Sequence, residues 1–313
     1  MFEEILKMIE ENDPIILHRH WNPDGDALGS QIGFKHLILE NFPGKTVYTV
    51  GDAAGRYGFM AGSGMDLVPD EAFENALCVI LDTAARGLIS DERYASARFT
   101  ARLDHHLFVE KIAQAEVIDS SYESCCGLVT QMAVECGWRI NAAAAQALYT
   151  GMVTDSGRFR YDSTSARTFQ LAAKLMEQPI DTNELYRNLY ANDLDQVKQR
   201  ARFIQKIQLT PHRVAYIYTS RQDLTGPDAD SALISRGMVG VMSDIRGVDV
   251  WVNFTESDKG VLCELRSSRY NINPIAVKYG GGGHAKASGA TVKTREEAMQ
   301  MLSDLDQLAE ENP

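Results

Sequence analysis

The sequence has little cysteine, and its cysteines are not spaced to hold a metal or to form disulfides. Among 313 residues there are five cysteines, at positions 78, 125, 126, 136 and 263. None of them forms a CxxC pair, and their number is odd. This pattern argues against both a structural zinc site and a disulfide framework.

Basic residues are also in short supply. The chain has 31 Lys and Arg against 43 Asp and Glu, a formal net charge of -12. Proteins that hold long DNA or RNA rely on a surplus of Lys and Arg, so we expect no groove for long nucleic acid. The acidic composition does not exclude a short anionic substrate, because bound cations can reverse the local charge of an acidic site.

Long apolar runs are absent as well, so the sequence predicts no transmembrane helix. Residues 1–14 alternate apolar and acidic side chains and lack the basic start and continuous apolar stretch of a signal peptide. We therefore expect a cytoplasmic protein. With 44% hydrophobic and 24% charged residues, the composition is that of a globular protein, and the length favours two domains.

The first half repeats one pattern: a short run of branched apolar residues, a polar turn, and a stretch compatible with a helix. Such alternation predicts an α/β fold with a parallel sheet and helices on both faces. The expected strands are 14–18, 45–50, 77–81, 101–103 and 115–118. The expected helices are 27–41, 123–136 and 141–153.

The second half has a different pattern, typical of a smaller α+β domain. Strands are expected at 214–220, 248–255 and 261–267, and a closing helix at 296–308. We predict a catalytic metal-binding domain over 1–190, a helical linker over 191–210 and a substrate-binding domain over 211–313. The cleft between the two domains is the expected place for the active site.

Aspartate or histidine directly follows an apolar run in four separate segments. The segments are HWNPDGD (20–26), LDTA around Asp82, LDHH (103–106) and VTDSG around Asp155. Each one has a structural explanation, since Asp24 and Asp26 suit a turn and Asp26 or Asp82 could cap a helix. Their recurrence favours a shared site, because a parallel sheet brings the carboxyl ends of its strands to one edge.

A cluster of carboxylates and imidazoles is costly unless cations neutralise it. Mixed oxygen and nitrogen ligands without cysteine favour manganese, iron or zinc, and oxygen-rich octahedral sites favour manganese or magnesium. Two such ions about 3.5–4 Å apart can activate a water and stabilise both oxygens of a phosphoryl displacement. The segments therefore predict a two-metal site for phosphate ester hydrolysis.

In type, order and spacing the four segments resemble motifs one to four of the DHH phosphoesterase family, over most of residues 15–160. The resemblance implies two divalent ions, Mn²⁺ first, with Mg²⁺ or Co²⁺ as alternatives. The implied metal ligands are His20 and Asp24 for one ion, Asp26, His105 and Asp155 for the other, and Asp82 as the bridge.

The same resemblance gives His106 and Asp104 catalytic roles. His106 is expected to face the scissile phosphate and stabilise its non-bridging oxygens. Asp104 is expected to orient the histidines, as carboxylates near metal sites often do. His18 lies two residues before His20, and we interpret it as a packing residue.

The glycine tract KYGGGGHAKASGA (278–290) lacks the spacing of a phosphate-binding loop. By itself it is compatible with a flexible turn. It resembles, however, the glycine and histidine signature of the DHH-associated C-terminal domain, which implies that it contacts the substrate. The implied substrate-binding residues are Gly282, Gly283 and His284, with Arg266 and Ser267 for a phosphate remote from the metals. Arg158 and Arg160 stay open as phosphate contacts or as loop charges.

With this C-terminal domain, the chain resembles the branch that cleaves very short RNA to mononucleotides and converts 3'-phosphoadenosine 5'-phosphate to AMP. The expected partner is such a short RNA or small nucleotide. The sequence leaves undecided whether the protein forms a homodimer. One alternative is a phosphodiesterase for cyclic di-AMP or its linear dinucleotide pApA. A long-chain exopolyphosphatase or exonuclease would want a basic groove or extra domains. A nucleotide-binding sensor is disfavoured, because no motif position is lost.

Overall fold

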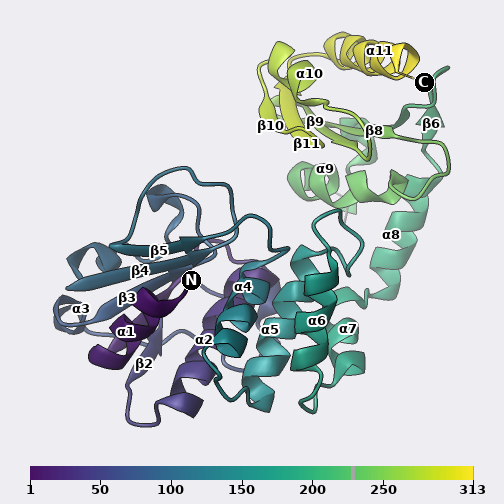
Figure 1. The fold of residues 1–313 in the computed structure, drawn as a ribbon. Coiled ribbons are helices and arrows are strands. Elements are labelled where there is room, and N and C mark those ends of the chain that lie inside the picture. The colour runs from purple at the N-terminus through teal and green to yellow at the C-terminus, as the bar shows by residue number, and fades with distance from the viewer. Residues whose placement is uncertain (227–229, 313) are drawn as a thin grey trace. The chain divides into compact units, whose positions relative to one another are not determined.

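The chain folds as two compact units, Met1–Ala191 and Asn192–Pro313 (Figure 1). The structure is a computed structural model that describes residues 1–226 and 230–312. Each unit contains its own sheet and its own hydrophobic core. Among the described helices, none combines the length and the apolar character needed to cross a membrane.

The sheet of the first unit has five parallel strands in the order β2-β1-β3-β4-β5. The strands are β1 (Ile15–His18), β2 (Val47–Thr49), β3 (Leu77–Leu81), β4 (Phe99–Asp104) and β5 (Ala115–Ile118). Every residue of β1 and β3 is buried, because both faces of the sheet are covered. The strand order reverses between β1 and β3, so the carboxyl ends of these two strands mark the expected ligand position of such a sheet.

Long helices cover one face of this sheet, and shorter elements cover the other. Leu17, Val79 and Leu103 point to the first face, whereas Ile16 and Ile80 point to the second. The helices are α1 (Glu3–Glu11), α2 (Gly25–Asn41), α3 (Asp70–Glu74), α4 (Cys125–Glu135), α5 (Ala142–Asp155), α6 (Ala166–Leu175) and α7 (Thr182–Tyr190), and the 3₁₀ turns are η1 (Gly55–Tyr57), η2 (Arg86–Leu88) and η3 (Glu92–Ser96). The predicted α/β sheet is confirmed, although α3 is the one α-helix packed on the second face within the described residues.

Helices α2 and α5 pack against each other through glycines spaced four residues apart. A Cβ at Gly25 would lie 2.5 Å from Thr154 Oγ1, and a Cβ at Gly29 would lie 2.6 Å from the carbonyl oxygen of Ala147. A Cβ at Gly33 would lie 2.5 Å from the side chain of Leu148. These glycines allow a close approach that brings the start of α2 next to the end of α5.

The second unit has a mixed six-stranded sheet in the order β10-β11-β9-β8-β7-β6, with β7 and β8 parallel and the other neighbours antiparallel. Its strands are β6 (Gln208–Leu209), β7 (Ala215–Thr219), β8 (Val250–Ser257), β9 (Gly260–Ser267), β10 (Gly282–His284) and β11 (Ala287–Val292). Its helices are α8 (Leu194–Ile204), α9 (Ser231–Val239), α10 (Asn273–Lys278) and α11 (Arg295–Glu311), with the 3₁₀ turns η4 (Arg221–Asp223) and η6 (Gly240–Met242). Helices α10 and α11 pack on one face of the sheet, and α8 and α9 on the other.

Two features of the second unit differ from the simplest interpretation of the sequence. Phe203 of α8 is buried in the core of this unit, so the helix in the stretch expected to link the domains contributes to that core. The glycine tract does not form a flexible turn. Its residues Gly282 to His284 form β10, which pairs with β11 in an antiparallel hairpin.

We predict that Gly29→Ala lowers the free energy of unfolding by about 1–3 kcal/mol, because the added methyl group meets backbone that cannot move away freely. Circular dichroism during urea unfolding measures the effect. Gly237→Ala in α9 is the matched control: a Cβ there meets nothing within 4 Å, so the variant should gain about 0.5–1 kcal/mol. Equal stability of the two variants would contradict the close packing of α2 and α5.

Candidate metal centre

The four sequence segments meet at the carboxyl edge of the first sheet. His20 and Asp24 follow β1, Asp82 follows β3, and the two histidines of the LDHH segment follow β4. Their potential ligand atoms form three overlapping groups, each with all atoms within 4.8 Å of one another. The groups are His20, Asp24 and Asp82; Asp26, His105 and Asp155; and Asp82, His105 and His106.

Asp82 lies at the centre of this arrangement. Its side chain is 2% exposed, and its φ of 50° places it in the left-handed region. His20 Nε2 is 3.5 Å from Asp82 Oδ2, and His105 Nε2 is 3.4 Å from Asp82 Oδ1. Burial raises the pKa of Asp82, but His105 and His20 outweigh it and hold the pKa below its usual value. A strained, buried carboxylate between two imidazoles suits a bridging metal ligand.

Backbone carbonyls orient both histidines that flank Asp82. His20 Nδ1 is 2.9 Å from the carbonyl oxygen of Trp21, and His105 Nδ1 is 3.3 Å from that of Tyr122. Because a carbonyl oxygen can only accept, it selects the Nδ1–H tautomer and leaves the Nε2 lone pair for a metal. Both Nε2 atoms face the carboxylates of the cluster.

Asp24 and Asp26 have structural roles in addition to their place in the cluster. Asp24 Oδ1 accepts hydrogen bonds from the backbone N–H of Asp26 and Ala27, so Asp24 caps α2 and the helix begins at Gly25. The buried carboxylate of Asp26 instead accepts the backbone N–H of Cys125 and Cys126, at 2.7 and 2.9 Å. Asp26 therefore ties α2 to the first turn of α4, a contact that the sequence did not indicate.

The cluster carries more negative charge than its own cations neutralise. Burial raises the pKa of Asp26 well above its usual value, and the charge of Asp82 adds to the shift. Burial also raises the pKa of Asp155 to about 7, although His105 opposes the shift. Among the described residues, the buried Oδ1 of Asp82 has no hydrogen-bond partner. These observations and the mixed oxygen and nitrogen donors fit a site for divalent metal ions.

Asp104 holds His106 in place through a buried ion pair. Arg102 Nη2 is 2.5 Å from Asp104 Oδ2, and both side chains are fully buried. Asp104 Oδ1 is 2.7 Å from His106 Nδ1 and raises the pKa of this histidine. His106 itself is 45% exposed. The hydrogen bond to Asp104 occupies its Nδ1, so Nε2 is the nitrogen that can contact a substrate.

The five expected substrate-binding residues lie in the second unit, on strands β9 and β10. Arg266 pairs with Ala287, and Ala287 pairs with His284, so all three lie in one row across β9, β11 and β10. Residues paired directly across strands share a face. Arg266 and His284 therefore flank the small side chain of Ala287 on one surface of the sheet.

Gly282, Gly283 and Ser267 have different surroundings. Gly282 pairs with Gly289, so no side chain from either strand stands on the sheet at this pair. Gly283 has a φ of +133°, and a Cβ there would lie 2.6 Å from the carbonyl oxygen of Ala287. The Ser267 hydroxyl donates to the carbonyl oxygen of Asp249 and accepts from the N–H of Tyr270, so it stabilises the turn after β9.

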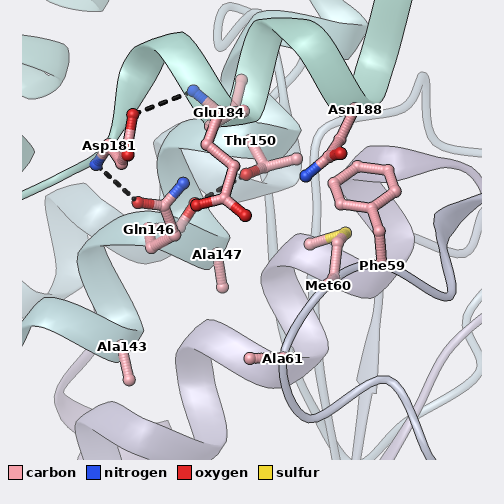
Figure 2. A pocket seen from close by; sticks show the side chains of 11 residues that line it. Phe59, Met60, Ala61, Ala143, Gln146, Ala147, Thr150, Asp181, Glu184 and Asn188 are labelled. Carbon is pink, nitrogen blue, oxygen red and sulfur yellow. Dashed lines mark hydrogen bonds between the residues drawn. The ribbon is translucent and has the colours of Figure 1, made fainter.

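A cavity of about 230 Å³ lies elsewhere in the first unit and contains none of the expected ligands. Residues 59–61, α5 and α7 line it, and Figure 2 shows Asp181 at the start of α7 hydrogen-bonded to Gln146 of α5 and to Glu184. The proposed metal ligands instead lie at the carboxyl edge of the sheet, outside this cavity. The chemistry of the side chains, and not the size of a cavity, identifies the candidate site.

A parallel sheet that gathers carboxylates and imidazoles at its carboxyl edge defines this chain as a metal-binding α/β protein. Comparison with known families makes the assignment specific. The DHH family N-terminal domain matches residues 14–152, and the DHHA1 domain matches residues 214–311. The chain belongs to the DHH family, which confirms the resemblance seen in its motifs.

Several relatives match over all or nearly all of their length. The chain is 33% identical over 315 residues to the bifunctional oligoribonuclease and PAP phosphatase NrnA of Bacillus subtilis, covering 100% of both chains. It is 31% identical over 307 residues to the protein of the same description from Mycoplasma genitalium, covering 96% of this chain and 95% of the relative. Among solved structures, an exopolyphosphatase-related protein from Bacteroides fragilis matches with a TM-score of 0.86 and 26% identity, covering 99% of this chain and 97% of that one.

We predict that Asp82→Ala weakens the binding of both metal ions by at least about ten-fold, because both lose a shared ligand. Isothermal titration with Mn²⁺ measures the affinity and the number of ions bound. Asp70→Ala is the control, since Asp70 is 82% exposed and pairs with Arg93 outside the cluster. If Asp82→Ala bound two ions with wild-type affinity, the bridging role would be wrong.

Proposed function

We propose that this chain is a two-metal phosphoesterase that cleaves very short RNA to mononucleotides and removes the 3'-phosphate of 3'-phosphoadenosine 5'-phosphate. The observation that carries the proposal is the convergence of all four DHH segments around Asp82, at the carboxyl edge of the sheet. The full-length similarity to relatives described as bifunctional oligoribonuclease and PAP phosphatase supports the choice of substrates.

We propose His20 and Asp24 as ligands of one ion and Asp26, His105 and Asp155 as ligands of the other, with Asp82 shared. The grouping of their potential ligand atoms supports this division. When bound, the ions supply an activated water and neutralise charge on the reacting phosphate. Manganese is the metal we propose, because the donors combine imidazole nitrogen with several carboxylate oxygens and include no thiolate.

The remaining steps depend on side chains of the protein. His106, held at Nδ1 by Asp104, presents its other nitrogen to the non-bridging oxygens of the scissile phosphate. The raised pKa of His106 favours the protonated form, which stabilises the negative charge that develops there. The buried ion pair with Arg102 fixes the position of Asp104, so the histidine is oriented before substrate arrives.

The row formed by Arg266, Ala287 and His284 is proposed to hold the nucleotide beyond the scissile phosphate. Arg266 can pair with a phosphate, and the small side chain between Arg266 and His284 leaves room for a sugar. The net charge of -12 agrees with short substrates, because the chain has no surplus of cations to hold a long RNA.

We expect the purified protein with Mn²⁺ to hydrolyse a diribonucleotide, a five-nucleotide RNA and 3'-phosphoadenosine 5'-phosphate faster than a 24-nucleotide RNA or pyrophosphate. Initial rates over this panel, with cyclic di-AMP included, measure the preference. Asp82→Ala prepared in parallel reports any contaminating nuclease. A clear preference for cyclic di-AMP would replace this proposal with a signalling phosphodiesterase, and turnover of no substrate would favour a sensor.

His284→Ala should lower kcat/KM for a diribonucleotide by about ten-fold, because a hydrogen bond from His284 to a charged group is lost. Hydrolysis of a minimal aryl phosphate should change by less than about two-fold, since that substrate ends at the metal centre. His212→Ala, which removes a histidine paired with Asp306 in the same unit, is the control. Equal losses on both substrates would exclude His284 from nucleotide binding.

A further inference from the structure

The turn that follows Asp155 has a strained backbone. Gly157, Arg158 and Phe159 have φ values of 57°, 64° and 62°, and the last two residues are not glycine. The N–H of Arg158 donates to the carbonyl oxygen of Val153 at 2.8 Å, which folds the turn back on the end of α5. A strained conformation that its surroundings hold in place is typical of a functional position.

This turn places the guanidinium group of Arg158 at the end of α7. The group lies over the ring of Tyr190, 3.6 Å from its centroid. A second guanidinium group reaches the same helix end, because Arg56 Nη2 donates to the carbonyl oxygen of Leu189 at 3.1 Å. Two arginines from segments about a hundred residues apart therefore contact consecutive residues of one helix.

No carboxylate of residues 1–226 or 230–312 lies within ion-pair distance of either guanidinium group, although the chain has an excess of acidic residues. Two cations held near each other repel. The carbonyl groups at the end of α7 offset only part of this repulsion, since a helix terminus carries about half a charge. An anion bound between Arg56 and Arg158 would remove the remaining cost.

Both arginines belong to segments that adjoin those of the proposed metal ligands. Arg158 is three residues after Asp155, whose Oδ2 is 3.5 Å from His105 Nε2. Arg56 precedes Tyr57, which packs against a hydrophobic cluster that includes Leu28 and Ile32 of α2. Asp24 caps that helix, so Arg158 follows one proposed metal ligand in sequence, and the segment of Arg56 packs on a helix that carries others.

We propose that Arg56 and Arg158 bind a second, non-scissile phosphate of the substrate next to the metal centre. This inference rests on the proposed function, because it takes the substrate to be a nucleotide with more than one phosphate. Guanidinium groups suit the role, since they donate paired hydrogen bonds to phosphate oxygens and stay charged. The site differs from Arg266 and Ser267 because it lies wholly in the first unit.

Titration calorimetry with 3'-phosphoadenosine 5'-phosphate and with adenosine 3'-monophosphate tests the site, in a Ca²⁺ buffer in which control assays detect no hydrolysis. The monophosphate keeps the scissile 3'-phosphate and lacks the 5'-phosphate. The wild-type protein should bind the bisphosphate at least about ten-fold more tightly than this monophosphate, the size expected for a charged hydrogen bond. Arg158→Ala and Arg56→Ala should each bring this ratio to within about two-fold of one. Arg158→Lys should give an intermediate ratio, because lysine keeps the charge and loses the paired hydrogen bonds.

Arg139→Ala is the matched control, since Arg139 is 76% exposed and pairs with Glu40 elsewhere in the first unit. It should keep the wild-type ratio. An unchanged ratio in both alanine variants, or no preference for the bisphosphate in the wild-type protein, would overturn the inference. If the wild-type protein prefers the bisphosphate in this assay but hydrolyses no nucleotide with Mn²⁺, the proposed function fails while the arginine site stands.

Discussion

The negative charge of Asp82 is held where water can hardly reach it, and the rest of the site is arranged around that charge. His20 and His105 turn their Nε2 atoms towards it, and burial together with the same charge raises the pKa of Asp26. Such crowding of carboxylates opposes folding unless cations neutralise it. Metal binding should therefore stabilise the first unit as well as supply its chemistry.

The geometry of the cluster depends on how closely two helices pack. The DGD segment opens α2 and Asp155 ends α5, so the distance between these helices sets the distance between their ligands. Glycine at positions 25, 29 and 33 of α2 lets the backbone of α2 approach Thr154, Ala147 and Leu148 of α5 closely. The glycine between Asp24 and Asp26 thus serves packing and not only the turn, because Thr154 occupies the space that its Cβ would need.

The strands of the first unit were predictable because a parallel sheet covered on both faces requires continuous apolar runs. Strands β3 and β5 have the bounds expected from such runs. The start of α2 was less predictable, since the choice of Asp24 as its cap depends on the geometry of the turn. In the second unit, β10 was missed, because glycines carry no apolar signal and the strand exists only through its pairing with β11.

For the site, the sequence by itself determined which residues are the candidate metal ligands, because residue type and spacing along the chain identify the four DHH segments. It also showed Asp104 beside the histidines. Only the tertiary structure decided that Asp26 accepts hydrogen bonds from the first turn of α4, and that Arg56 contacts the end of α7. These contacts join distant segments through packing and buried hydrogen bonds, and neither has a repeating pattern that the order of residues could reveal.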